Sequence, residues 1–243
     1  MNQKKIILKV FFCWLACVVN AQPASEKTIT WDFPVKYGTE EWENLKTVED
    51  RFHAYNIPDE IIQKNSTTEL VKVCMAYPAW GLMTAYNDRM TGLSVVVRLF
   101  NGFRELLNRD DAATELLKTY NNLDPRSVES DWTPLQQGLY SFEIEKIEMF
   151  FNTNRMFNKL TKVEIQNLKV AVVSNYQKKK MFSQIYSTDD LSATVGIGLK
   201  IVRKVDPDII KVRTDMATFS FHLRSSEITF WDSAVELIEK TNL

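Results

Sequence analysis

Residues 133–151 have the sequence TPLQQGLYSFEIEKIEMFF and give the clearest evidence for the fold. Thr133 is a good N-cap residue, and Pro134 suits the first helical position, where its missing N–H costs nothing. The apolar side chains that follow share one helical face: Leu135, Leu139, Phe142, Ile147, Phe150 and Phe151. We therefore expect one amphipathic helix over residues 133–151.

Helical spacing also runs through the stretch from Trp80 to Leu107. Apolar residues recur three or four positions apart along its whole length. We expect two helices here, with a break near Thr91-Gly92. Asn101-Gly102 is a hairpin turn signal in other contexts, but the helical spacing continues through it. We therefore expect a kinked helix at that point.

Capping residues mark the start of several other expected helices. Ser66 and Thr161 each precede a glutamate by three positions, which is the capping-box pattern. Thr218–Leu223 alternates as a strand does, but it has no second strand to pair with, so we expect it to be extended. The other expected helices lie near residues 40–42, 48–55, 58–65, 67–76, 110–120, 161–178, 187–204, 209–213 and 226–240.

The composition indicates the same fold class. The chain has only 7 glycines and 7 prolines among its 243 residues. We predict an all-α fold, either an irregular multi-helix bundle or stacked helical hairpins, with about ten helices, several of them short. We expect a single helical domain over residues 38–243, preceded by an extended or disordered arm at residues 22–37.

The first 21 residues have the features of a cleavable secretory signal peptide. Two lysines form the positive region, Ile6–Ala16 is almost wholly apolar, and Val19-Asn20-Ala21 suits a signal peptidase. The apolar run is shorter than the roughly 20 residues that span a membrane. We therefore expect an exported protein, periplasmic or secreted, that begins at Gln22 and keeps no transmembrane segment.

A lipid anchor is the alternative at this end of the chain. Leu15-Ala16-Cys17 resembles the end of a bacterial lipobox, although a lipobox usually begins with an aliphatic residue where this chain has Trp14. In that case Cys17 would be acylated and would hold the protein at a membrane. With either cleavage, too few cysteines remain for an internal disulfide framework, since Cys74 is the only one after residue 17.

The charge balance argues against a nucleic-acid partner. The chain has 30 basic and 31 acidic residues, and removal of the predicted signal peptide takes three lysines, which leaves 27 against 31. A phosphate-binding surface needs the opposite balance or a strong basic stripe. Lys178–Lys180 is a short basic run at an expected helix C-terminus, where cations complement the helix dipole.

Four stretches in the first half of the chain form a recognisable set: Ile57–Glu60, Ser66–Val71, Tyr77-Pro78 and Asn101–Ala113. With them the chain resembles, over roughly residues 31–125, a group of uncharacterised exported helical proteins of Bacteroidota. The resemblance implies export and a helical fold, and it carries no known activity. Some members continue into a module with an Asn-Cys-His motif and implied papain-like chemistry, but this chain lacks that motif.

The sequence gives little support for a nucleophile, a metal site or a cofactor site. Cys74 with His53 or His222 is the available thiol–imidazole combination, but Cys74 falls on an apolar helix face, as a buried small side chain does. One cysteine and two distant histidines have no metal-ligand spacing. Gly196-Ile197-Gly198 lacks the third glycine of a dinucleotide site. We expect no metal and no cofactor.

Two carboxylates are the candidates for acid–base chemistry. Glu145 and Glu148 lie three positions apart on the helix expected over residues 133–151, which places them on one face. They would serve a hydrolase that uses the acidic residues of a groove. The alternative interpretation is a solvated charged face, because Lys146 lies between them.

Aromatic residues near Pro78 are the candidates for binding. Tyr77, Trp80 and Tyr86 cluster at a junction between expected helices. Such rings stack on sugars and are favoured at protein interfaces, although they also fill gaps in a helical core. The leading hypothesis is an exported, non-enzymatic protein that binds a protein or glycan partner in the cell envelope.

Overall fold

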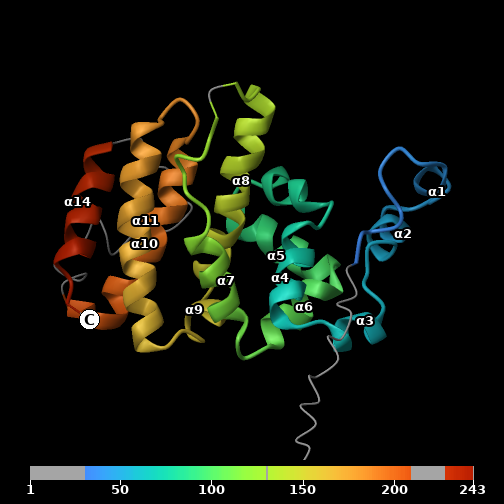
Figure 1. Cartoon of the computed structure of the whole chain (residues 1–243), viewed down its shortest axis with the longest axis horizontal. Helices are drawn as coiled ribbons and strands as arrows, with labels where there is room; N and C mark the ends of the chain where they lie inside the picture. Colours follow the sequence, from blue (N-terminus) through green and yellow to red (C-terminus); the bar gives the residue numbers. More distant parts are fainter. Residues whose placement is uncertain (1–30, 130, 209–227, 243) are drawn as a thin grey trace, which may run out of the picture.

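The fold is that of a computed structural model, which describes residues 31–129, 131–208 and 228–242. These residues form thirteen helices and no strand, so the predicted all-α fold is confirmed (Figure 1). The predicted signal peptide, residues 22–30 of the predicted arm, the helix at 209–213 and the extended Thr218–Leu223 lie outside the described residues.

The helices differ in length between the two halves of the chain. Those that begin before residue 122 have at most 11 residues, whereas α8, α10 and α11 have 18 to 20. In chain order they are α1 (Glu40–Glu43), α2 (Val48–His53), α3 (Asp59–Lys64), α4 (Thr67–Met75), the 3-10 helix η1 (Trp80–Ala85), α5 (Arg89–Leu99), α6 (Asn101–Asn108), α7 (Ala112–Asn121), α8 (Pro134–Phe151), α9 (Asn154–Phe157), α10 (Lys162–Met181), α11 (Thr188–Val205) and α14 (Ile228–Lys240).

Helix α8 stands near the middle of the molecule, with α10, α11 and α14 on one side and α4, α5 and α6 on the other (Figure 1). It packs against α5, α7, α9 and α11. Its start is fixed by a complete capping box, in which the Thr133 hydroxyl accepts from the Gln136 N–H and the Gln136 side chain accepts from the Thr133 N–H. The helix predicted from residue 133 to residue 151 is confirmed.

The break predicted near Thr91-Gly92 is wrong. Helix α5 runs through both residues, because Asp88 caps it and accepts from the Thr91 N–H at 2.7 Å. Gly92 has a packing role instead, since a Cβ atom at this position would lie 2.1 Å from the backbone oxygen of Met83 in η1. The glycine therefore allows η1 to lie directly against α5.

The kink predicted at Asn101-Gly102 is a complete break between α5 and α6. Phe100 is extended, with φ −119° and ψ 123°. The Asn101 side chain accepts from the Ile57 N–H at 2.9 Å and donates to the Ile57 oxygen at 2.7 Å. This pairing with a residue 44 positions earlier ties the break to the turn that precedes α3.

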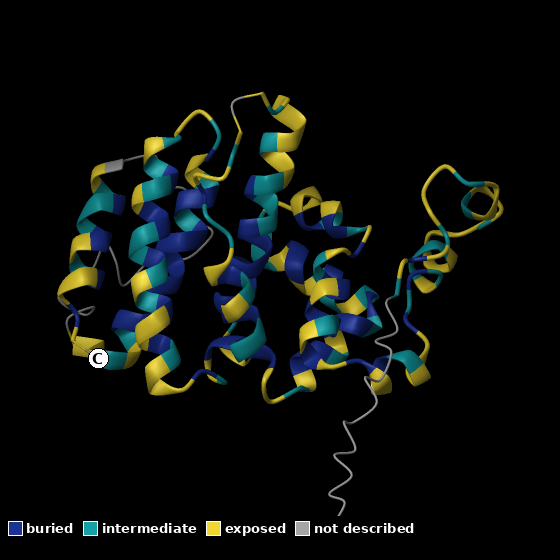
Figure 2. Cartoon of the chain, in the orientation of Figure 1, coloured by how far each residue is buried: buried dark blue, intermediate teal, exposed yellow. Residues whose placement is uncertain are grey.

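A large core joins α3 to α11, and a smaller one joins α10, α11 and α14. Buried residues line the inner faces of the helices (Figure 2). Residues 31–37 form no helix, yet Phe33 is buried and Trp31 donates its indole N–H to the oxygen of Tyr55 at 3.3 Å. Trp31 and Phe33 therefore pack this part of the predicted arm against the large core, while Tyr37 is exposed.

The structure also bears on disulfide bonds and on membrane-spanning helices. Cys74 is a free, buried cysteine, so the described part of the chain contains no disulfide. None of the described helices is both long and apolar enough to cross a lipid bilayer.

Candidate functional site

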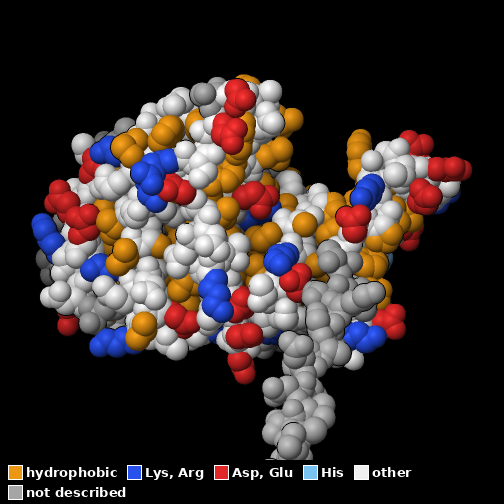
Figure 3. Space-filling view, in the orientation of Figure 1, with side chains coloured by type: hydrophobic (Ala, Val, Ile, Leu, Met, Phe, Trp, Pro, Cys, Tyr) orange, Lys and Arg blue, Asp and Glu red, His pale blue; other side chains and the backbone are white. Residues whose placement is uncertain are grey.

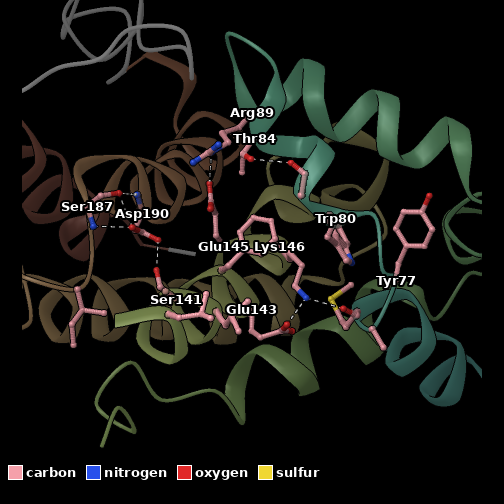
Figure 4. Close-up of a pocket in the computed structure, with 18 of the residues that line it drawn as sticks. Tyr77, Trp80, Thr84, Arg89, Ser141, Glu143, Glu145, Lys146, Ser187 and Asp190 are labelled. Atoms are coloured by element: carbon pink, nitrogen blue, oxygen red, sulfur yellow. Dashed lines mark hydrogen bonds and ion pairs between the residues drawn. The ribbon is translucent and has the colours of Figure 1, made fainter. Parts of the chain in front are cut away.

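A pocket of about 720 Å³, which we name the α8 pocket, opens beside the N-terminal half of α8. Its walls come from the turn after α4, from η1, from the first residue of α5, from α8 and from the turn before α11 (Figure 4). Its lining combines apolar side chains with a smaller set of charged and hydroxyl groups. Such a combination is typical of ligand and partner sites.

One wall of the α8 pocket is an exposed apolar surface. Leu135 is 72% exposed and Leu139 is 56% exposed, although both are large aliphatic side chains. They lie on the free end of α8, which changes from mostly exposed to mostly buried at Ser141 (Figure 2). Hydrophobic side chains are visible along this end of the helix in Figure 3. The helix thus presents apolar area that the domain itself does not cover.

Glu145 brings a buried carboxyl group to the α8 pocket. Its side chain points towards Arg89 (Figure 4), and the Arg89 Nε donates to Glu145 Oε1 at 2.8 Å. Burial raises the pKa of Glu145 from 4.5 to about 7, the Arg89 charge opposes this rise, and Asp190 adds to it. Glu145 therefore gains or loses its proton near neutral pH.

Lys146 follows Glu145 in the chain, but its ammonium group bonds to other residues. Its ammonium donates to the backbone oxygen of Met75 at 2.7 Å and to Glu143, and it lies 5.5 Å from the ring centre of Trp80. Burial lowers the pKa of Lys146, while its ion pair with Glu143 opposes that change. This lysine joins α8 to the turn after α4 and covers one face of the indole.

Asp190 lines the α8 pocket as a structural group. Its Oδ1 accepts from the Ser141 hydroxyl at 2.6 Å, and its Oδ2 accepts from both the N–H and the hydroxyl of Ser187 at 2.7 Å. The Ser187 contacts form the capping box that starts α11. Both oxygens of Asp190 are therefore occupied in joining α11 to α8.

The aromatic residues predicted for binding are only partly brought together. Tyr77 and Trp80 line the α8 pocket, but they are 2% and 3% exposed, and other rings or Lys146 cover them. The Trp80 indole N–H donates to the backbone oxygen of Cys74 at 2.8 Å. Tyr86 is 41% exposed and does not line the α8 pocket. These residues do not form a single exposed aromatic surface.

The two predicted carboxylates do not share the α8 pocket. Glu145 lines it, whereas Glu148 is completely buried behind it. Glu148 accepts from Tyr120 and Thr194 on Oε1, at 2.8 Å each, and from Lys179 on Oε2 at 2.7 Å. Burial raises the pKa of Glu148, and the charge of Lys179 opposes that rise.

The thiol–imidazole combination does not form a site. Cys74 is completely buried in the large core, and burial raises the pKa of its thiol well above the ordinary value. A thiol in such surroundings is a poor nucleophile, because its thiolate is disfavoured. His53 is exposed on α2, and His222 lies outside the described residues. Within the described ranges, no group of three or more His, Cys, Asp or Glu side chains could hold a metal ion.

Sequence reasoning missed Arg89 and did not distinguish Leu135 and Leu139 from the buried residues on the same face of α8. The Arg89–Glu145 pair joins residues 56 positions apart, which no local pattern reveals. The two leucines share the predicted apolar face of α8 with buried residues, but none of the described helices covers that end of α8. No family model, curated protein or solved structure matches this chain.

Proposed function

We propose that this chain is an exported, non-enzymatic binding protein that holds a segment of a protein partner in the α8 pocket, within the cell envelope. The observation that best supports the proposal is the exposed apolar wall formed by Leu135 and Leu139. Large aliphatic side chains that stay in water at the edge of a pocket are typical of interaction sites.

The nature of the walls favours a protein segment over a glycan. Sugars are held by exposed flat rings, and the rings in the α8 pocket, Tyr77 and Trp80, are almost fully covered. Aliphatic walls such as Leu135 and Leu139 match the side chains of a peptide instead. A cleft of about 720 Å³ can accept a few residues of an extended segment.

The state of the carboxyl groups favours binding over hydrolysis. Asp190 uses both oxygens within the fold, Glu143 is paired with Lys146, and Glu148 lies outside the α8 pocket. Of the described acidic residues that line the α8 pocket, Glu145 alone is left to act on a substrate. A hydrolase is the second candidate function, because burial raises the pKa of Glu145 to about 7, which suits a general acid at neutral pH.

Site-specific photocrosslinking tests the proposed function. A benzophenone side chain at position 139 is expected to trap a discrete protein partner in envelope extract. The matched control places the same group at Met181, which is 65% exposed and does not line the α8 pocket. Identical products from both positions would contradict binding in the α8 pocket. Turnover in a hydrolase substrate screen that disappears in Glu145→Gln would favour the second candidate.

Export is tested separately by the intact mass of the protein recovered from its own cells. A chain that begins at Gln22, with or without cyclisation of that residue, is the expected product. A mass that corresponds to an acylated Cys17 would instead establish the lipid-anchored alternative. An uncleaved chain in the cytoplasm would contradict both.

A further inference from the structure

The Glu145 carboxyl group is incompletely satisfied by the fold. The side chain is only 5% exposed, and Oε1 accepts from Arg89. Oε2 has no hydrogen-bond partner among the described residues, although Glu145 lines the α8 pocket. The fold does not enclose Oε2, which stays open to solvent in the α8 pocket. A donor on a ligand in the α8 pocket would replace that solvent and bond to Oε2.

The surroundings of Glu145 select a positively charged donor. The carboxylates exceed the cations around it: Glu143, Asp189 and Asp190 against Arg89 and Lys146. Lys146 directs its ammonium to Met75 and Glu143, so it does not supply the missing bond. Together with Glu145 itself, the local charge is negative and complements a cation.

We propose that the partner segment held in the α8 pocket carries a lysine or arginine side chain that donates to Oε2 of Glu145, with aliphatic neighbours packed on Leu135 and Leu139. This inference rests on the proposed function, because it assigns the chemistry of the segment to that same pocket. Arg89 bonds to Oε1, which leaves Oε2 without a protein partner among the described residues.

The site makes binding depend on pH. Besides burial, the charges that shift the pKa of Glu145 are those of Arg89 on α5, Asp190 on α11, and the paired Lys179 and Glu148 behind it. A basic side chain binds the ionised carboxylate, so below about pH 7 it must displace a proton. Affinity is therefore expected to rise about tenfold between pH 6 and pH 8.

Selection of peptides from a random heptapeptide phage library tests the inference. The library is selected on the wild-type chain and, in parallel, on Leu139→Gln. We expect the peptides that need Leu139 to combine one Lys or Arg with aliphatic residues. We expect the synthetic peptides to lose at least tenfold in affinity when norleucine replaces the basic residue, and to bind the wild type about tenfold more tightly at pH 8 than at pH 6.

Variants of the protein complete the test. Glu145→Gln is expected to abolish both the preference for the basic residue and the pH dependence, while the exposed Glu236→Gln on α14 keeps both. The norleucine peptide tests the wild-type chain, so the inference stays open to refutation even if Glu145→Gln folds poorly. Peptides that need Leu139 but not a basic residue would overturn this inference alone. Failure to select any peptide that depends on Leu139 would overturn the proposed function as well.

Discussion

Helix α8 places two glutamates one turn apart in opposite situations. Glu148 is fully buried, and both of its oxygens accept hydrogen bonds, from Tyr120, Thr194 and Lys179. Glu145 is almost as buried, yet one of its oxygens pairs with Arg89 and the other has no partner within the described ranges. The first site is closed by the fold, and the second opens into the α8 pocket.

This difference separates a structural carboxylate from a candidate binding carboxylate. A buried charge can be tolerated where a counter-charge and further hydrogen bonds compensate for lost hydration. At Glu148 the fold supplies all of these from three other helices, α7, α10 and α11. At Glu145 the fold supplies Arg89 as the counter-charge and one hydrogen bond to Oε1, and Oε2 is available to a ligand. Changes to each site therefore have different expected effects.

The largest expected effect follows from Lys179→Met. It leaves the Glu148 carboxylate without its counter-charge in a fully buried site, so the free energy of unfolding is expected to fall by about 3–5 kcal/mol. Urea unfolding at neutral pH measures this loss.

The neighbouring lysine provides a matched control for this prediction. Lys180 also forms a 2.7 Å ion pair, with Asp232, but its side chain is 39% exposed. Lys180→Met is expected to cost no more than about 1 kcal/mol, because water screens the pair. Equal losses in the two variants would mean that the Glu148–Lys179 pair is not specially dependent on burial.

The second effect concerns the pH dependence of stability at Glu145. Its pKa is raised from 4.5 to about 7 in the folded chain, so between these values the folded state holds a proton that the unfolded state has released. This group therefore lowers the free energy of unfolding as pH rises from 4.5 to 7, by about 3 kcal/mol in all. Glu145→Gln removes that dependence.

The measurement is the difference in unfolding free energy between Glu145→Gln and the wild type across this range. It is expected to grow in favour of the variant from pH 4.5 to pH 7 and then to level off. Other groups, including Glu148, titrate in both proteins and largely cancel in the difference. Glu236→Gln serves as the exposed control and is expected to show a nearly constant difference. A flat profile for Glu145→Gln would show that Glu145 titrates as an ordinary surface carboxylate.

The third effect is smaller and concerns the hydrogen bond by which Ser141 on α8 holds Asp190 on α11. Ser141→Ala removes the donor to Asp190 Oδ1, a 2.6 Å bond to a carboxylate that is 7% exposed. The expected loss in unfolding free energy is about 2 kcal/mol. Ser94→Ala on α5 is the control, because its exposed hydroxyl bonds only to the Met90 oxygen. A loss below about 0.5 kcal/mol in Ser141→Ala would mean that water replaces the serine at Asp190.

The helices were predictable where local chemistry determines them. The start of α8 follows from Thr133 and Pro134, and the start of α10 from Thr161 with Glu164, since each cap is complete within three residues. The all-α class followed from the same kind of evidence. Gly92 misled the prediction, because a glycine that allows close packing has the same sequence appearance as one that ends a helix.

The candidate site was predictable only in part, because its geometry is tertiary. Glu145 was identified as a candidate, but the sequence does not distinguish it from Glu148, whose partner Lys179 lies 31 positions away. The contribution of Arg89 depends on how α5 meets α8. Leu135 and Leu139 are exposed because none of the helices in the described part of the chain packs over them, and the amphipathic pattern of α8 does not encode this.

The smallest expected effect on stability lies at the exposed end of α8. Leu139→Gln is expected to change the free energy of unfolding by no more than about 0.5 kcal/mol, because the leucine is 56% exposed and glutamine is a good helix former. On the same helix, Ile147 is 1% exposed, and Ile147→Ala is expected to cost about 2–5 kcal/mol. A residue whose loss leaves folding intact but removes partner binding serves the α8 pocket rather than the core. If Leu139→Gln destabilised the chain as Ile147→Ala does, the exposed wall would belong to the packing of the fold and would not be available to a partner.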